Sequence, residues 1–122
     1  MESIENLSKN IETKLRLIKF TQEQAEKSVE TNNVLAMERQ IKTLTMKVGE
    51  VHDIKVKIQE LKIEKGENIE DIQTWNAALE DKLFAIEAQI ADVDNSLKRI
   101  GQKAIEAEKL KEEEMAAQSR QR

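Results

Sequence analysis

The sequence predicts an all-α protein, an antiparallel up-down-up three-helix bundle, or short coiled coil, with an extended third helix. The chain of 122 residues has no proline, no cysteine and only three glycines, so little interrupts long helices. Toward the C-terminus, apolar residues recur every three or four positions, which is the spacing of a coiled-coil seam. The residues of this seam are Ile69, Ile72, Asn76, Leu79, Leu83, Ile86, Ile90, Val93, Leu97, Ile100, Ala104 and Ala107.

The first helix is predicted from about residue 3 to residue 30. Its seam consists of Ile4, Leu7, Ile11, Leu15, Ile18, Gln22, Ala25 and Val29. Near Gln22 and Ala25 this seam is thin, because neither side chain buries the apolar area of a leucine. We therefore expect the end of the helix near Asn32 to be the loosest part of the bundle. The run Thr31-Asn32-Asn33 predicts a turn, since these residues cap helices and tolerate reversals.

The second helix is predicted from about residue 34 to residue 65. Its seam consists of Val34, Met37, Ile41, Leu44, Val48, Val51, Ile54, Ile58 and Leu61. Gly66 suits the left-handed position just past a helix end. Lys62 and Lys65 precede it in the last turn, where the helix dipole favours cations.

The third helix is predicted from about residue 69 to residue 114. Asn68 can cap it, and Glu70 and Asp71 lie near its positive dipole end. Its seam continues beyond the level of Val34, so this helix should extend past its partners. Residues 108–122 lose the seam and are predicted to be a charged, fraying C-terminal extension or linker, which leaves residues 1–107 as the bundle.

The register of the helices follows from their seams. In an antiparallel pair, the numbers of facing residues keep a nearly constant sum, and both predicted hairpins satisfy this condition with short turns. Ile11, Ile54 and Leu79 then form one layer of the core. Asn76 is the polar member of the third seam. It either fixes the register of the bundle or lies partly exposed, bonded to a backbone carbonyl.

Several apolar residues lie off the seams or in the surplus seam of the third helix, and these form the candidate interaction surface. Trp75 either anchors a partner or covers the Gly66 end of the bundle against the first helix. The other off-seam residues either flank the core or form a second apolar strip for self-association. The candidate residues are Leu17, Phe20, Met46, Trp75, Phe84, Ile100, Ala104 and Ala107.

The sequence offers no pattern of residues for catalysis or for ligand binding. His52 is the only histidine and thiols are absent, so no zinc-site spacing exists, and His52 is expected to be solvated. No glycine-rich phosphate loop or nucleophile–histidine pairing is found, and a narrow bundle leaves little room for a small-molecule pocket. We therefore predict no enzymatic activity, no cofactor, no metal and no small-molecule substrate.

Charge and hydropathy limit the partners in the same way. The net charge of −4 demands neither a nucleic acid nor a membrane. Lys55, Lys57, Lys62 and Lys65 form a modest basic strip, but Glu60 and Glu64 interleave with it and no stacking aromatics accompany it. A nucleic-acid-associated helical protein is therefore a minor alternative. No apolar run approaches the ~20 residues that span a bilayer, and residues 1–11 lack the apolar core of a signal peptide, so we expect an intracellular, cytoplasmic protein.

Residues 56–90 carry Glu60-Leu61-Lys62-Ile63, then Gly66, Glu70, Trp75 and heptads from Leu79. This stretch resembles the N-terminal helical, coiled-coil regions of retroelement-type, gag-like polyproteins of animals. The resemblance implies a self-assembly module within a larger polyprotein. In length, the predicted bundle also resembles a spectrin repeat.

Two functions stay open at this point. The first is a non-catalytic helical-bundle module that associates with itself or docks another helical protein. The second is a structural spacer repeat of a cytoskeletal-type rod, in which the third helix would run on into a following repeat. The first requires a protein partner or a second copy of the chain.

Overall fold

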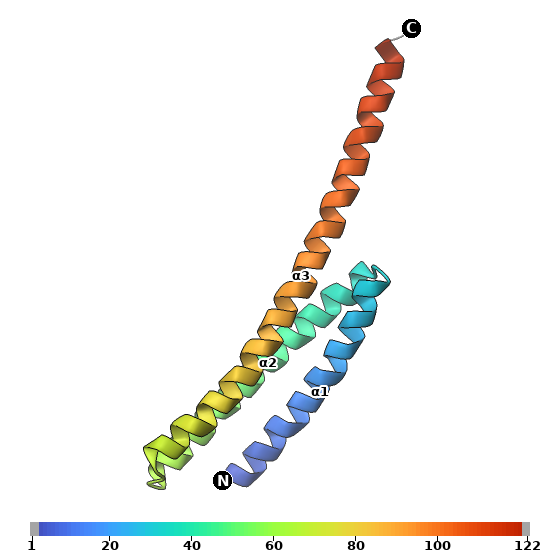
Figure 1. The fold of residues 1–122 in the computed structure, drawn as a ribbon. Helices are drawn as coiled ribbons and strands as arrows, with labels where there is room; N and C mark the ends of the chain where they lie inside the picture. Colours follow the sequence, from blue (N-terminus) through green and yellow to red (C-terminus); the bar gives the residue numbers. More distant parts are fainter. Residues whose placement is uncertain (1–2, 121–122) are drawn as a thin grey trace.

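The computed structural model describes the backbone of residues 3–120 and the side chains of residues 3–112. Three helices occupy almost all of this part of the chain: α1 (Ile4–Glu30), α2 (Val34–Glu64) and α3 (Ile69–Arg120). α1 and α3 run in one direction and α2 runs in the other, which confirms the predicted all-α, up-down-up bundle (Figure 1). No helix in the described residues is long and apolar enough to cross a membrane.

The predicted end of the third helix, near Glu114, is wrong, because α3 continues to Arg120. The residues beyond Glu114 are Met115-Ala116-Ala117-Gln118-Ser119-Arg120, which contain neither proline nor glycine. With mostly good helix formers and no helix breaker, nothing in the sequence terminates the helix there.

Both turns use the local chemistry that the sequence predicted. The side chains of Ser3 and Asn33 accept hydrogen bonds from backbone N–H groups in the first turns of α1 and α2, and Asn68 does the same for α3. At each reversal, the second residue after the helix has a positive φ, 53° at Asn32 and 73° at Gly66. The N–H of the next residue then bonds back to a carbonyl in the last helical turn, which satisfies that end of the helix.

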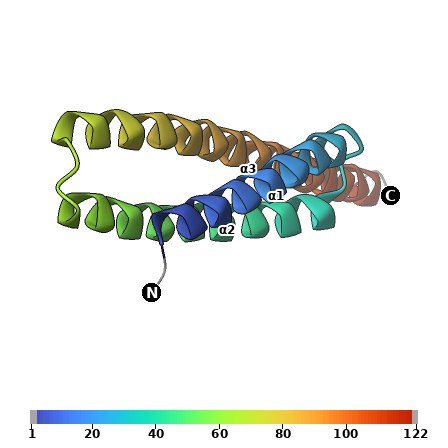
Figure 2. The same cartoon turned by 90° about the horizontal axis from the view of Figure 1, so that it is seen from below.

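The three helices do not pack equally. α2 packs against both α1 and α3, whereas α1 and α3 approach each other at few positions. Figure 2 shows α1 crossing the α2–α3 hairpin obliquely, and Figure 1 shows α3 continuing well past the turn that joins α1 to α2. α2 is thus the central helix of the packing, and α1 crosses the α2–α3 hairpin mainly through its contacts with α2.

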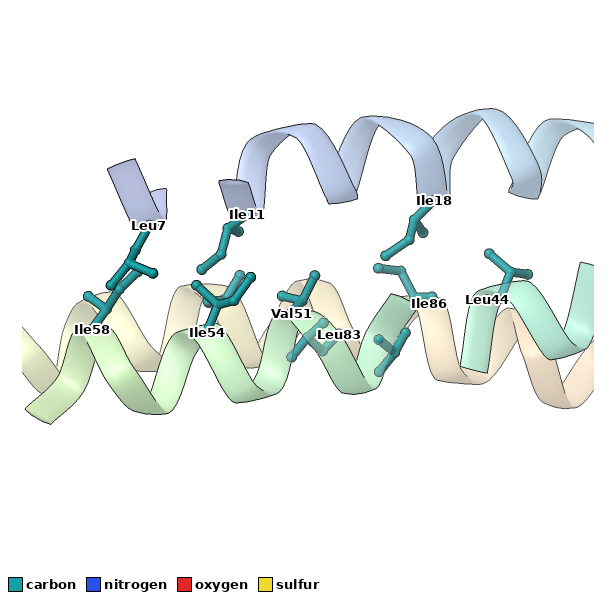
Figure 3. Close-up of a cluster of buried hydrophobic side chains, with 11 residues drawn as sticks. Leu7, Ile11, Ile18, Leu44, Val51, Ile54, Ile58, Leu83 and Ile86 are labelled. Carbon is teal, nitrogen blue, oxygen red and sulfur yellow. The ribbon is translucent and has the colours of Figure 1, made fainter. Parts of the chain in front are cut away.

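The core consists of two apolar clusters. The larger cluster includes the predicted layer of Ile11, Ile54 and Leu79, and Figure 3 shows its side chains converging from the three helices. Its buried residues are Leu7, Ile11, Ile18, Leu44, Val48, Val51, Ile54, Ile58, Leu79, Leu83 and Ile86. The smaller cluster lies toward the Asn32 turn and joins Ala25, Met37 and Val93, with Ile100 packed against it.

In the second half of α1, the buried residues differ from the predicted seam. Thr21, Ala25 and Ser28 are buried, whereas Gln22 is only half-buried. The oblique crossing of α1 shifts its contact line by about one residue. The hydroxyls of Thr21 and Ser28 donate to the carbonyls of Leu17 and Gln24 within the same helix, so burial leaves neither donor unpaired.

Candidate interaction surfaces

The most exposed element is the part of α3 beyond the bundle. Every side chain from Gly101 to Glu112 is exposed, including those of Ala104 and Ala107. Ile100 differs, because it is half-buried against the smaller core cluster. The predicted surplus seam is therefore divided: Ile100 belongs to the bundle, and the two alanines lie outside it.

Two large apolar residues of this exposed segment were not among the predicted candidates. Ile105 is 58% exposed and Leu110 is 61% exposed. Both fall off the 3-4 repeat that identified the seam, so a search along that repeat passes over them. A different signal would have found them: a large apolar residue that lies beyond the last position a facing helix can cover.

The off-seam candidates Leu17, Phe20, Met46 and Phe84 are all exposed. They do not form a single strip. Lys14 of α1 pairs with Glu50 of α2. Leu17 follows Lys14 by about one helical turn, and Met46 precedes Glu50 by about one turn on the antiparallel α2. Both residues therefore lie next to this pair, on its side toward the Asn32 turn. Leu17 and Met46 therefore share the α1–α2 side, whereas Phe84 is on α3 between Glu80 and Glu87, both of which face α2.

Trp75 is half-buried and packs against the larger core cluster. The Lys62 ammonium lies 5.2 Å from the centroid of its ring, in cation–π geometry. The ring also borders a groove of about 210 Å³ together with Ser8, Ile11, Glu12 and Leu15 of α1. These contacts favour the interpretation of Trp75 as a cover between α3 and α1.

Asn76 accepts a hydrogen bond of 2.8 Å from the side-chain amide of Gln59 on α2. This pairing differs from the backbone contact that the sequence left open. A polar pair between two seams is satisfied only when the two helices are in one particular register. Asn76 and Gln59 thus favour the register seen in the α2–α3 hairpin.

Ion pairs join α2 to both of its neighbours. Lys55 of α2 is only 4% exposed, and its ammonium donates a hydrogen bond to Glu80 of α3. This hydrogen bond holds the pKa of Glu80 below its ordinary value. On the other side, Glu50 accepts hydrogen bonds from Lys47 at 2.9 Å and from Lys14 of α1 at 3.0 Å, and these lower its pKa.

The basic strip of α2 is consequently not an open cationic surface. Lys55 is buried against Glu80, and Lys62 lies over Trp75 and 3.6 Å from the carboxylate of Glu67. Because Lys55 and Lys62 are engaged in these contacts, the strip offers less charge to a phosphate backbone than the sequence suggested.

A shallow groove of about 510 Å³ runs between α2 and α3. It is lined by Thr45, Val48, Gly49, His52, Asp53, Glu87 and Ile90. Val48 and Ile90 supply apolar surface, and Asp53 and Glu87 supply acidic groups. His52 is exposed, as the sequence predicted. No group of three or more potential metal ligands occurs in the described residues.

Comparison with protein-family models, with curated proteins and with solved structures finds no match. The class of protein therefore rests on the fold and on its surfaces. What they define is a small helical bundle with exposed apolar side chains on α3 and on the α1–α2 side.

Proposed function

We propose that this chain is a non-catalytic helical-bundle module whose task is protein assembly, by self-association or by docking another helical protein. The observation that carries the proposal is the exposed continuation of α3. From Gly101 to Glu112 every described residue is exposed, and Ile105 and Leu110 hold large apolar side chains in water. Most helical stability in proteins comes from packing an apolar face, so this segment gains stability from a partner.

The use of the charged groups supports a structural role. Lys55, Glu80, Lys14 and Glu50, which could otherwise serve acid–base chemistry, connect one helix to the next. The grooves are open and shallow, whereas small-molecule sites usually enclose most of their ligand. An assembly module fits these features, and we propose a cytoplasmic location for it.

The resemblance of residues 56–90 to gag-like polyproteins supports the same proposal. Such a relationship would place the bundle within a larger polyprotein, as its self-assembly segment. It adds a biological setting to the physical argument from α3, but the proposal does not depend on it.

The second candidate, a spacer repeat of a rod, is favoured by the same continuation of α3. In a rod of this kind, one long helix leaves a bundle and enters the next. The two functions differ in what covers residues 101–112: a separate molecule in the assembly module, and a following repeat of the same chain in the rod. Association of the isolated chain favours the first.

Sedimentation equilibrium of three proteins tests the proposal: the intact chain, a chain truncated after Ile100, and Phe20→Lys. Truncation after Ile100 keeps the residue that packs on the smaller cluster. We expect the intact chain to associate as its concentration rises and the truncated chain to stay monomeric. Self-association is wrong if all three remain monomers at high concentration, and docking to a different helical protein or a spacer role is then preferred.

A further inference from the structure

The groove between α2 and α3 continues along one face of α2. Gly49 lines this groove, and Val56 and Ile63 follow it at intervals of one heptad. Residues at this spacing share one face of a helix. Val56 is 37% exposed and Ile63 is 57% exposed, so this face carries apolar side chains beyond the groove itself. We name the groove residues together with Val56, Glu60 and Ile63 the α2–α3 flank.

The flank offers an open apolar surface of the length that a docked helix needs. From Gly49 to Ile63 it spans about 21 Å of α2, or about four helical turns. Val48 and Ile90 line the groove from its two helices, and all seven lining residues belong to α2 and α3, so α1 leaves this side open. A Cβ at Gly49 would meet nothing within 4 Å, so a partner can approach the backbone of α2 there.

The charged residues of α2 between 45 and 63 divide between its two sides. Glu50 and Lys47 pair with each other, and Glu50 also pairs with α1. Lys57 follows Glu50 by one heptad, so it lies on the α1 side as well. Asp53 lines the groove, and Glu60 follows Asp53 by one heptad, so both of these acids lie on the flank.

The other bases in this region also lie away from the flank. Lys55 is buried and donates a hydrogen bond to Glu80, and Lys62 lies over the ring of Trp75. Lys82, the single base of α3 between residues 69 and 91, borders a groove that α3 shares with α1. The charges of the flank are therefore three carboxylates, those of Asp53, Glu60 and Glu87.

We propose that the α2–α3 flank docks a basic amphipathic helix of another protein. The apolar face of this helix would cover Val48 and Ile90, and its lysines or arginines would lie beside the three carboxylates. A helix in the groove between two others completes a four-helix arrangement, which buries apolar surface that the three helices leave exposed. The inference rests on docking of a helical protein as the proposed function and adds the surface and the chemistry of the partner.

Charge selects this occupant among helices. Opposite charges across an interface favour a partner and like charges disfavour it, so three carboxylates on an apolar surface select a cationic helix over an acidic one. A second copy of this chain is the poorer occupant, because it brings a net charge of −4. Lys42, one heptad before Gly49, ends the acidic stretch toward the Asn32 turn, so the basic residues of the partner belong on the Gly66 side of the groove.

A pair of synthetic peptides tests the chemistry of the partner. Both are amphipathic helices with leucine at 3-4 spacing, and one carries lysine at its polar positions where the other carries glutamate. Fluorescence anisotropy measures their binding to the intact chain. We expect the lysine peptide to bind, more weakly as salt rises, and the glutamate peptide to bind at least about tenfold more weakly. Equal affinity of the two peptides overturns the proposal.

Two glycine variants test the position of the lysine peptide. Gly49→Gln places a neutral side chain in the groove without disturbing the fold, since a Cβ there meets nothing within 4 Å. The dissociation constant of this variant should rise about tenfold. Gly101→Gln makes the same change at an exposed position of α3 outside the groove and should leave binding unchanged. Equal binding by the two variants places the peptide elsewhere and overturns the proposal.

Charge reversal supplies an independent readout. Glu87→Lys puts a base on the flank and should raise the dissociation constant of the lysine peptide about tenfold, with a weaker dependence on salt. Glu23→Lys makes the same change at an exposed position of α1 and should leave the affinity within about twofold. A larger loss of affinity in Glu23→Lys than in Glu87→Lys would place the peptide on α1, contrary to the proposal.

The outcomes separate this site from the proposed function. If sedimentation shows an associating chain while Gly49→Gln binds the lysine peptide as well as the original chain does, the flank is wrong and assembly stands. If Gly49→Gln abolishes self-association, a second copy occupies the flank and a basic partner protein is wrong. If the chain stays monomeric but binds the lysine peptide through the flank, docking of a helical protein is the function that remains.

Discussion

The ammonium of Lys55 on α2 donates a hydrogen bond to the carboxylate of Glu80 on α3, at a point where only 4% of the lysine is exposed. A lysine is rarely buried to this extent unless it is paired. The pair lies at the edge of the apolar cluster that holds Ile54 and Ile58. The pair favours one register between α2 and α3, as the hydrogen bond between Gln59 and Asn76 does one helical turn further along.

The two halves of this pair should respond differently to mutation. Lys55→Met removes the buried charge and keeps much of the side-chain volume, so we expect unchanged or increased stability. Glu80→Ala leaves the ammonium of Lys55 without its carboxylate, and we expect a clear loss. Urea denaturation of both variants measures the difference. Equal losses would mean that the attraction within the pair outweighs the cost of burying the lysine.

Ile54 contributes to the layer in which the three helices meet. Ile54→Ala should lower the free energy of unfolding by about 2–5 kcal/mol, because it forfeits burial and leaves a cavity. The control is Ile63→Ala on the same helix, where the side chain is 57% exposed and the loss should stay within about 0.5 kcal/mol apart from helix propensity. Similar losses in the two variants would contradict the assignment of Ile54 to the core.

The glycines at 49 and 66 have opposite roles, although both lie on or next to α2. A Cβ at Gly49 meets nothing within 4 Å, so Gly49→Ala should stabilise the helix by about 0.5–1 kcal/mol. Gly66 has a φ of +73°, which side chains disfavour, so Gly66→Ala should destabilise by about 1–2 kcal/mol. Thermal unfolding at a concentration where the chain is monomeric measures both. A gain from alanine at both positions would argue against the left-handed turn.

Glu50 makes stability depend on pH. Hydrogen bonds from Lys47 and Lys14 hold its pKa below the ordinary value of 4.5 when the chain is folded. The stabilisation is therefore fully present above that value and is lost as the pH falls through the folded-state pKa. We expect Glu50→Gln to be less stable than the original chain at neutral pH and the difference to vanish in acid. Glu23→Gln, at an exposed position of α1, is the control for the loss of a charge.

The residues explain how far the sequence could predict this structure. The helices, the turns and the layer of Ile11, Ile54 and Leu79 were predictable, because large aliphatic residues at 3-4 spacing and an asparagine or glycine at each turn have few other uses. The burial of Thr21 and Ser28 could not be predicted, since small polar residues enter a core only when hydrogen bonds within their own helix satisfy their hydroxyls. Lys55 was missed for a similar reason: whether a lysine is buried depends on a carboxylate 25 residues away, and the sequence does not show the contact.

The interaction surface was harder to predict than the core. Leu17, Phe20, Met46 and Phe84 were expected off the seams and are exposed, but their distribution over different faces depends on the oblique packing of α1. The periodicity of one helix does not specify how it crosses another. Likewise, the seam of α3 does not show where the helix leaves the bundle. That point separates the half-buried Ile100 from the exposed Ala104 and Ala107.

The second half of α1 should open more readily than the rest of the bundle. Its buried residues are Thr21, Ala25 and Ser28, whereas residues 34–51 of α2 bury Met37, Leu44, Val48 and Val51. Small side chains contribute less apolar area, so local opening of residues 22–30 costs less free energy than opening of residues 34–51. Amide hydrogen exchange should therefore be faster in residues 22–30. The measurement belongs at low protein concentration and again at high concentration, because the proposed assembly surface is the exposed part of α3 and not α1. Association should then protect residues 101–112 and leave the exchange of residues 22–30 unchanged, and protection confined to α1 would show that a second molecule covers that helix instead.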